Sequence, residues 1–161
     1  MDFCIRTESW ALREPFVIAR ETMLALPLAH LTIRHAGFTG SAEAAGVDYR
    51  GETPESMAAE IQAYLEGCET PPSRAALLRD MPAGGARNAI DCALWDWEAK
   101  STGVPAATLA GFERLKPLET AYTLSIAPPQ DMAASALRAP RGAVLKLKLG
   151  GKDGLDIDRV A

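Results

Sequence analysis

Strand-like and helix-like segments alternate between residues 119 and 161, and this order restricts the possible folds more than any other feature of the chain. Residues 119–126 and 142–149 are predicted strands, and residues 128–138 and 155–161 are predicted helices. A strand, a helix and a second strand favour a parallel pair, because parallel strands need a crossover connection. Two parallel strands with their helices cannot cover both faces of a sheet. The pattern therefore predicts that the sequence stops in the middle of a domain.

The first part of the chain is predicted to combine β-strands with helices. Residues 3–8 and 31–34 alternate in the two-residue period of strands, and residues 38–45 are a predicted hairpin partner. A loop that contains Arg20 is expected over residues 13–27. The predicted helices that follow span residues 54–66, 73–81 and 85–101.

Charge and hydropathy exclude several classes of protein. The chain of 161 residues carries 17 Lys and Arg against 21 Asp and Glu, a net charge of −4 without a basic stripe, which argues against nucleic acid as a partner. The most apolar run, residues 23–29, is far shorter than the roughly 18–20 residues of a membrane helix, so no membrane partner is expected. The N-terminus has no signal-peptide pattern, and the three cysteines form no CxxC pair. These features favour reduced thiols and a cytoplasmic location.

Two lysines stand two positions apart in the predicted strand at residues 142–149. On a strand, Lys146 and Lys148 point to one side and the neighbouring leucines to the other. A solvated amphipathic strand would explain this pattern. Strands of βα repeats are normally covered on both faces, however, so inward lysines are costly unless they have a task. Two neighbouring ammonium groups also disfavour each other's charged form, which suits one of them to act as a base near neutral pH.

Two segments are distinctive: residues 88–100 with the Gly103-Val-Pro105 and Leu109-Ala-Gly111 motifs that follow, and Lys146-Leu-Lys148. The first resembles the signature helix, and the second the K-x-K motif, of the enolase superfamily, and within it of the muconate-lactonising and mandelate-racemase branch. The loop at residues 15–20, the segment 49–53 and the strand at 120–126 resemble those of the branch's dipeptide epimerases.

The resemblance implies a fold of two domains. Residues 1–112 would form an α+β capping domain, and residues 113–161 the start of a (β/α) TIM-type barrel, truncated after about two strands. The site of such an enzyme would lie at the C-terminal ends of the barrel strands.

The resemblance also implies an isomerase that removes a proton next to a carboxylate with the help of Mg²⁺. The leading substrate would be a dipeptide of the L-Ala-D/L-Glu type. Lys148 would be the acid/base, and Lys146 would contact the substrate carboxylate and keep Lys148 partly neutral. Arg20 would approach the acidic side chain of the dipeptide. Thr123, and less directly Ser125, would line the substrate pocket.

The family's metal ligands and its second, opposing lysine are placed on later barrel strands by the same resemblance. No metal ligand is therefore assigned in this chain, and Mg²⁺ is expected only in a longer protein. The fragment is expected to be inactive alone, with a homo-oligomer as a possible assembly.

Two alternatives stay open at this point. The same lysines would serve a cycloisomerase, an o-succinylbenzoate synthase or an acid-sugar dehydratase of the branch. A chain with open strand edges would alternatively be a non-catalytic fragment or interaction module.

Overall fold

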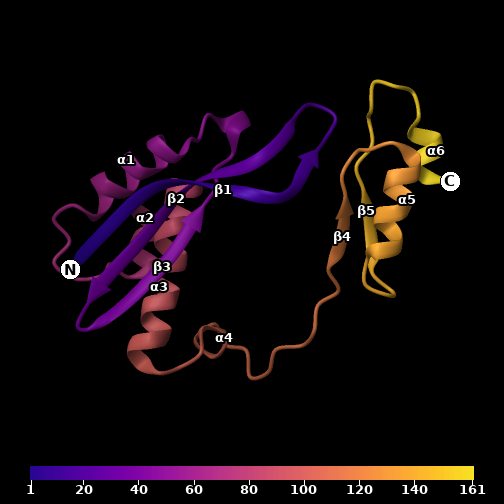
Figure 1. The fold of residues 1–161 in the computed structure, drawn as a ribbon. Helices are drawn as coiled ribbons and strands as arrows, with labels where there is room; N and C mark the ends of the chain where they lie inside the picture. The colour runs from indigo at the N-terminus through magenta and orange to yellow at the C-terminus, as the bar shows by residue number, and fades with distance from the viewer. The chain divides into compact units, whose positions relative to one another are not determined.

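A computed structural model describes residues 1–161, apart from the side chain of Asp48. The chain forms two compact units (Figure 1). The first unit comprises residues 1–10 and 27–115, and the second comprises residues 11–26 and 116–161. The domains 1–112 and 113–161 stay a prediction from the sequence.

The first three strands form one sheet in the order β1-β2-β3. They are β1 (Asp2–Val17), β2 (Thr22–His35) and β3 (Phe38–Ala44). The β2 and β3 strands are antiparallel, with Ala29 opposite Ala44 and His35 opposite Phe38. The β structure predicted for the N-terminal residues is therefore confirmed.

The loop predicted over residues 13–27 is wrong. β1 continues to Val17 and β2 begins at Thr22, so only a short turn joins them. The Ile18 amide donates a hydrogen bond to the Glu21 carbonyl oxygen at 3.0 Å and closes this turn. Backbone pairing does not require side chains of alternating polarity, so this part of the hairpin carries no strand pattern in the sequence.

Helices complete the first unit after η1 (Asp48–Arg50). They are α1 (Pro54–Leu65), α2 (Arg74–Asp80), α3 (Gly85–Thr102) and α4 (Ala106–Leu109). Thr53 and Ser56 form a capping box at the start of α1: each side-chain oxygen accepts a hydrogen bond from the other residue's amide, at 3.1 and 2.9 Å. The helix ends predicted from capping residues are thus confirmed for α1, and Gly103 ends α3 in the left-handed conformation.

The core of the first unit lies between the sheet and the helices, and α3 packs closely against β3. Its fully buried large side chains come from β2, α1, α2 and α3: Leu31, Ile33, Met57, Ile61, Leu65, Leu77 and Ile90. Gly40 of β3 faces α3, where a Cβ atom would come within 2.1 Å of the Ala93 carbonyl oxygen. Only glycine allows this close approach of strand and helix.

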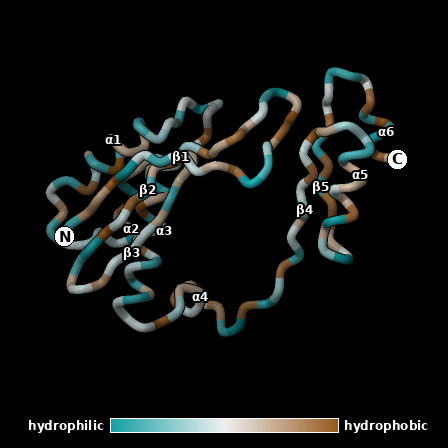
Figure 2. Tube along the Cα trace, in the orientation of Figure 1, coloured by the Kyte–Doolittle hydropathy of each residue, from teal (hydrophilic) through white to brown (hydrophobic). Residues whose placement is uncertain are grey.

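The second unit contains the predicted strand–helix–strand–helix repeat. Its elements are β4 (Ala121–Leu124), α5 (Pro129–Arg138), β5 (Val144–Leu147) and α6 (Asp156–Val160). β4 and β5 are parallel, with Ala121 beside Val144 and Leu124 beside Leu147. Figure 2 shows hydrophobic residues along β5, where Val144 and Leu145 are exposed. The predicted fold class is confirmed, whereas a closed barrel stays a prediction. Among the described residues, no helix has both the length and the apolar character of a membrane span.

The close contact at Gly40 leads to a stability prediction. Gly40→Ala is expected to lower the free energy of unfolding by about 3 kcal/mol, because the added methyl forces β3 and α3 apart. Ser41→Thr adds one carbon at the neighbouring exposed position and is expected to change this free energy by no more than about 0.5 kcal/mol. Urea denaturation followed by circular dichroism measures both values. Equal effects of the two substitutions would contradict the close approach.

Candidate functional site

The register of β4 and β5 separates two faces of the small sheet. Thr123 of β4 lies beside Lys146 of β5, so these two side chains share one face. Leu124 and its neighbour Leu147 point to the opposite face. Leu124 is buried, and α5, whose Met132 is also buried, packs against β4. The leucine face is therefore the one that the helix covers, and the lysine face is the other.

Lys148 follows β5 directly, at its carboxyl end. Its amide donates a hydrogen bond to the Leu124 carbonyl oxygen at 2.9 Å, which continues the parallel pairing past the end of the strand. Its side chain is half-buried, and the ammonium nitrogen lies 5.3 Å from the centre of the Phe16 ring. This distance is within the range of a cation–π interaction.

The tip of the β1–β2 hairpin lies against the end of β4. The Ile126 amide donates to the Val17 carbonyl oxygen at 3.1 Å, and the Ser125 hydroxyl donates to the Pro15 carbonyl oxygen at 3.3 Å. Residues 14–17 and 122–127, together with Ser135, line a groove of about 450 Å³ beside these contacts.

The structure brings some of the predicted site residues together. Lys146 and Thr123 are neighbours, with Lys146 exposed and Thr123 half-buried. Thr123 also lines the groove. Arg20 is exposed in the hairpin turn. The roles of all four residues stay predictions.

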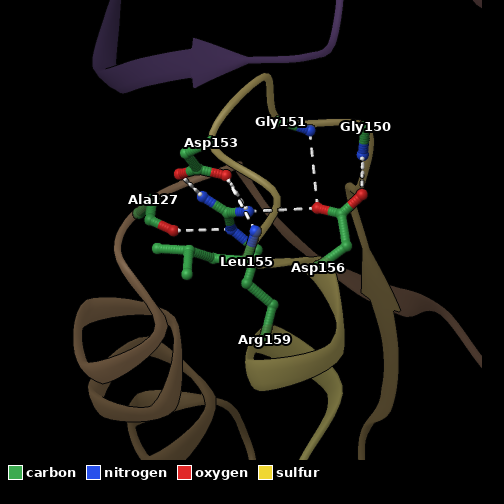
Figure 3. Close-up of polar contacts among 7 residues, drawn as sticks. All are labelled: Ala127, Gly150, Gly151, Asp153, Leu155, Asp156 and Arg159. Atoms are coloured by element: carbon green, nitrogen blue, oxygen red, sulfur yellow. Dashed lines mark hydrogen bonds and ion pairs between the residues drawn. The ribbon is translucent and has the colours of Figure 1, made fainter.

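Sequence reasoning did not find an ion-pair network around Arg159 (Figure 3). The Arg159 side chain is only 2% exposed. It donates to both carboxylate oxygens of Asp153, at 2.8 and 2.5 Å, and to Asp156 at 3.1 Å. Its Nε donates to the Ala127 carbonyl oxygen at 2.9 Å. The network therefore joins the loop after β5, the first turn of α6 and the loop after β4.

Hydrogen bonds explain the electrostatics of this network. Those from Arg159, followed by one from the Leu155 amide, lower the pKa of Asp153 to about 2. The same hydrogen bond from Arg159 to Asp153 raises the pKa of Arg159. From the sequence, Asp153 and Asp156 are expected only in a loop and the start of a helix, where they suit the helix dipole. The signal that this expectation missed was the three-residue spacing of Asp156 and Arg159, which places both on one side of a helix.

The lowered pKa of Asp153 predicts a dependence of stability on pH. The unfolded chain takes up this proton below its ordinary pKa near 3.8, whereas the folded chain takes it up only near 2, so acid favours unfolding. The contribution of Asp153 to the free energy of unfolding is fully present above about pH 4 and is lost as the pH falls to about 2. Urea denaturation across this range measures the loss, and Asp153→Asn is expected to make it smaller. Asp158→Asn, an exposed carboxylate on α6, is expected to behave as the parent chain does.

The described residues do not fit a Mg²⁺ site. They contain no group of three His, Cys, Asp or Glu side chains that could hold a metal ion. Asp153 and Asp156 instead pair with Arg159, so their oxygens already have partners. No chemical step of this chain is therefore assigned to a bound metal.

The structure thus shows an α+β unit, a strand–helix–strand–helix repeat and two lysines near the carboxyl end of the repeat's second strand. Residues 1–111 match the family model of the mandelate racemase / muconate lactonizing enzyme, N-terminal domain. The chain therefore belongs to this family of the enolase superfamily, whose capping domain its first part forms.

Relatives of known activity share both parts of the chain. The L-Ala-D/L-Glu epimerase of Escherichia coli is 35% identical over 144 residues, which covers 88% of this chain and 45% of that protein. Other relatives are named racemases and muconate cycloisomerases. The chain thus spans less than half the length of these relatives.

Solved structures confirm the arrangement of the fold. An enolase family member from Agrobacterium tumefaciens with homology to dipeptide epimerases has a TM-score of 0.88 and 37% identity, covering 98% of this chain and 48% of that one. Its crystal structure contains sodium and L-Ala-L-Glu. The dipeptide epimerase of Cytophaga hutchinsonii, complexed with Mg and D-Ala-L-Val, has a TM-score of 0.79 and 26% identity, covering 97% of this chain and 45% of that one.

Proposed function

We propose that the chain is the N-terminal part of a dipeptide epimerase of the L-Ala-D/L-Glu type. The observation that carries this proposal is the position of Lys148, half-buried at the carboxyl end of β5 and beside the hairpin tip. Catalytic groups of (β/α) barrels occupy this end of the strands. The proposal is an isomerase acting on a small substrate, with no step that involves nucleic acid or a membrane.

The two lysines would have different roles in the reaction. A neutral Lys148 amine takes the proton from the α-carbon of the substrate, and the electron pair of the broken C–H bond moves into the adjacent carboxylate. The Lys146 ammonium attracts that carboxylate. The Phe16 ring lies on one side of the Lys148 amine, 5.3 Å from its nitrogen.

Residues of β4 and the hairpin would select the substrate. Thr123 lies beside Lys146 and lines the groove, where its hydroxyl can bond to the peptide. Arg20, exposed in the turn, supplies a positive charge for the side-chain carboxylate of a Glu residue. The names of the Escherichia coli relative and the dipeptide in the Agrobacterium structure support this choice of substrate.

Mg²⁺ enters the proposal only for a longer protein, because the described residues do not form a site for it. The magnesium in the Cytophaga structure supports this expectation. A homo-oligomer and a cytoplasmic location stay predictions from the sequence.

The test uses the longest natural polypeptide that contains this sequence, with MgCl₂ added. Proton NMR follows deuterium exchange in D₂O at the α-carbon of the Glu residue of L-Ala-L-Glu. Lys148→Ala is expected to slow exchange by about 10²–10⁴-fold, because general acid–base catalysis contributes that much. Lys152→Ala removes an exposed lysine of the following loop and is expected to leave exchange unchanged. Undiminished exchange in Lys148→Ala would overturn the role of Lys148.

A cycloisomerase is the second candidate, because relatives named muconate cycloisomerase also match 86% of this chain. Turnover of muconate without any exchange at the dipeptide α-carbon would favour it over the epimerase.

A further inference from the structure

Gly150 lies directly against the turn of the β1–β2 hairpin. It adopts a φ of +96°, and a Cβ atom built on it would lie 2.9 Å from the Cβ of Ala19. Real Cβ atoms do not approach this closely, so the contact requires glycine for its size as well as for its conformation. Ala19 directly precedes Arg20 in the sequence, so this contact holds the backbone next to the predicted substrate-binding residue.

The backbone of Gly150 is held from its other side by Asp156. One carboxylate oxygen of Asp156 accepts from the Gly150 amide at 2.8 Å, and the other accepts from the Gly151 amide at 3.4 Å. These bonds fix the loop two residues after Lys148 (Figure 3).

Arg159 fixes Asp156 in turn. Its guanidinium is buried and bonds to Asp156, Asp153 and the Ala127 carbonyl oxygen. A buried guanidinium that loses one of these partners would leave an N–H group without an acceptor, so the four groups hold each other in one geometry. The contact at Gly150 is therefore connected to both loops that end the strands of the small sheet.

We propose that Gly150 supports the hairpin turn that bears Arg20, through its contact with Ala19; this contact is called the seat. Arg159 is a positioning residue that holds the seat through Asp156. The seat sets the distance between the Arg20 backbone and Lys148, and so the length of substrate side chain that the site accepts. The effect on the accepted length of the substrate side chain rests on the proposed function, whereas the contact of Gly150 with Ala19 does not.

The first experiment measures hydrogen exchange of residues 11–26 by mass spectrometry on the whole 161-residue chain. Gly150→Ala is expected to speed exchange in the hairpin turn by about tenfold, because the added methyl displaces Ala19. Gly142→Ala is the matched control: its φ is +80°, so it imposes a similar backbone strain outside the Arg159 network, but its Cβ would meet nothing within 4 Å. It is expected to leave exchange of the hairpin unchanged.

A rescue variant separates the contact from general damage to the fold. Ala19→Gly removes the opposing methyl, and in the Gly150→Ala background it is expected to restore most of the lost protection. Equal exchange in Gly150→Ala and Gly142→Ala, or no rescue by Ala19→Gly, would overturn the seat.

The role of Arg159 is tested through Asp156, because removing a buried guanidinium could unfold the unit. Asp156→Asn keeps one oxygen acceptor and is expected to speed exchange of the hairpin by roughly threefold, whereas Asp158→Asn is expected to have no effect. Identical behaviour of these two variants would remove Arg159 and Asp156 from the proposal.

Kinetics of the longer natural polypeptide then test the consequence for the substrate. Gly150→Ala is expected to raise KM for L-Ala-L-Glu by about tenfold with little change in kcat, because loss of binding alone appears in KM. An unchanged KM would show that the seat does not affect substrate binding. Failure of the parent enzyme to exchange any dipeptide would refute the proposed function while the exchange measurements still decide the seat.

Discussion

The backbone pairing of β4 with β5 is the constraint on which the candidate site depends. A parallel register that joins Thr123 to Lys146 also decides which face each leucine occupies. A slip by one residue would turn the lysines toward the helix face and the leucines away from it. The face on which each of these side chains lies is thus determined by hydrogen bonds of the backbone. Arg159 then supports this pairing from outside, because it bonds to the loops that follow both strands.

The fold could be predicted where a regular pattern repeats over many residues. The start of α1 at Pro54, the long helix α3 and the strand–helix–strand–helix order each left a clear signal, since packing and helix ends select residue types. The extension of β1 and β2 left none, because two paired backbones can form a ribbon with almost any side chains. The predicted strands were also too long: residues 119–126 and 142–149 contain strands of only four residues each.

The candidate site was predictable in part for a related reason. The spacing of Lys146 and Lys148 placed both on one face from the sequence alone, because strand geometry has a fixed period. The contacts of Phe16 with Lys148 and of Ala19 with Gly150 join residues more than a hundred positions apart, and no local pattern encodes such pairs. The Arg159 network was missed for a different reason, since its charged residues read equally well as a solvated helix start.

The path of the chain also has a consequence for biosynthesis. Residues 11–26 leave the first unit and return to it, yet their partners lie in residues 116–161. The bond between the Ser125 hydroxyl and the Pro15 carbonyl spans 110 positions. A ribosome therefore delivers the hairpin long before anything exists for its tip to rest on, and contacts over such sequence distances form slowly. During that interval both edges of the hairpin lack partner strands, and such edges favour association with other chains.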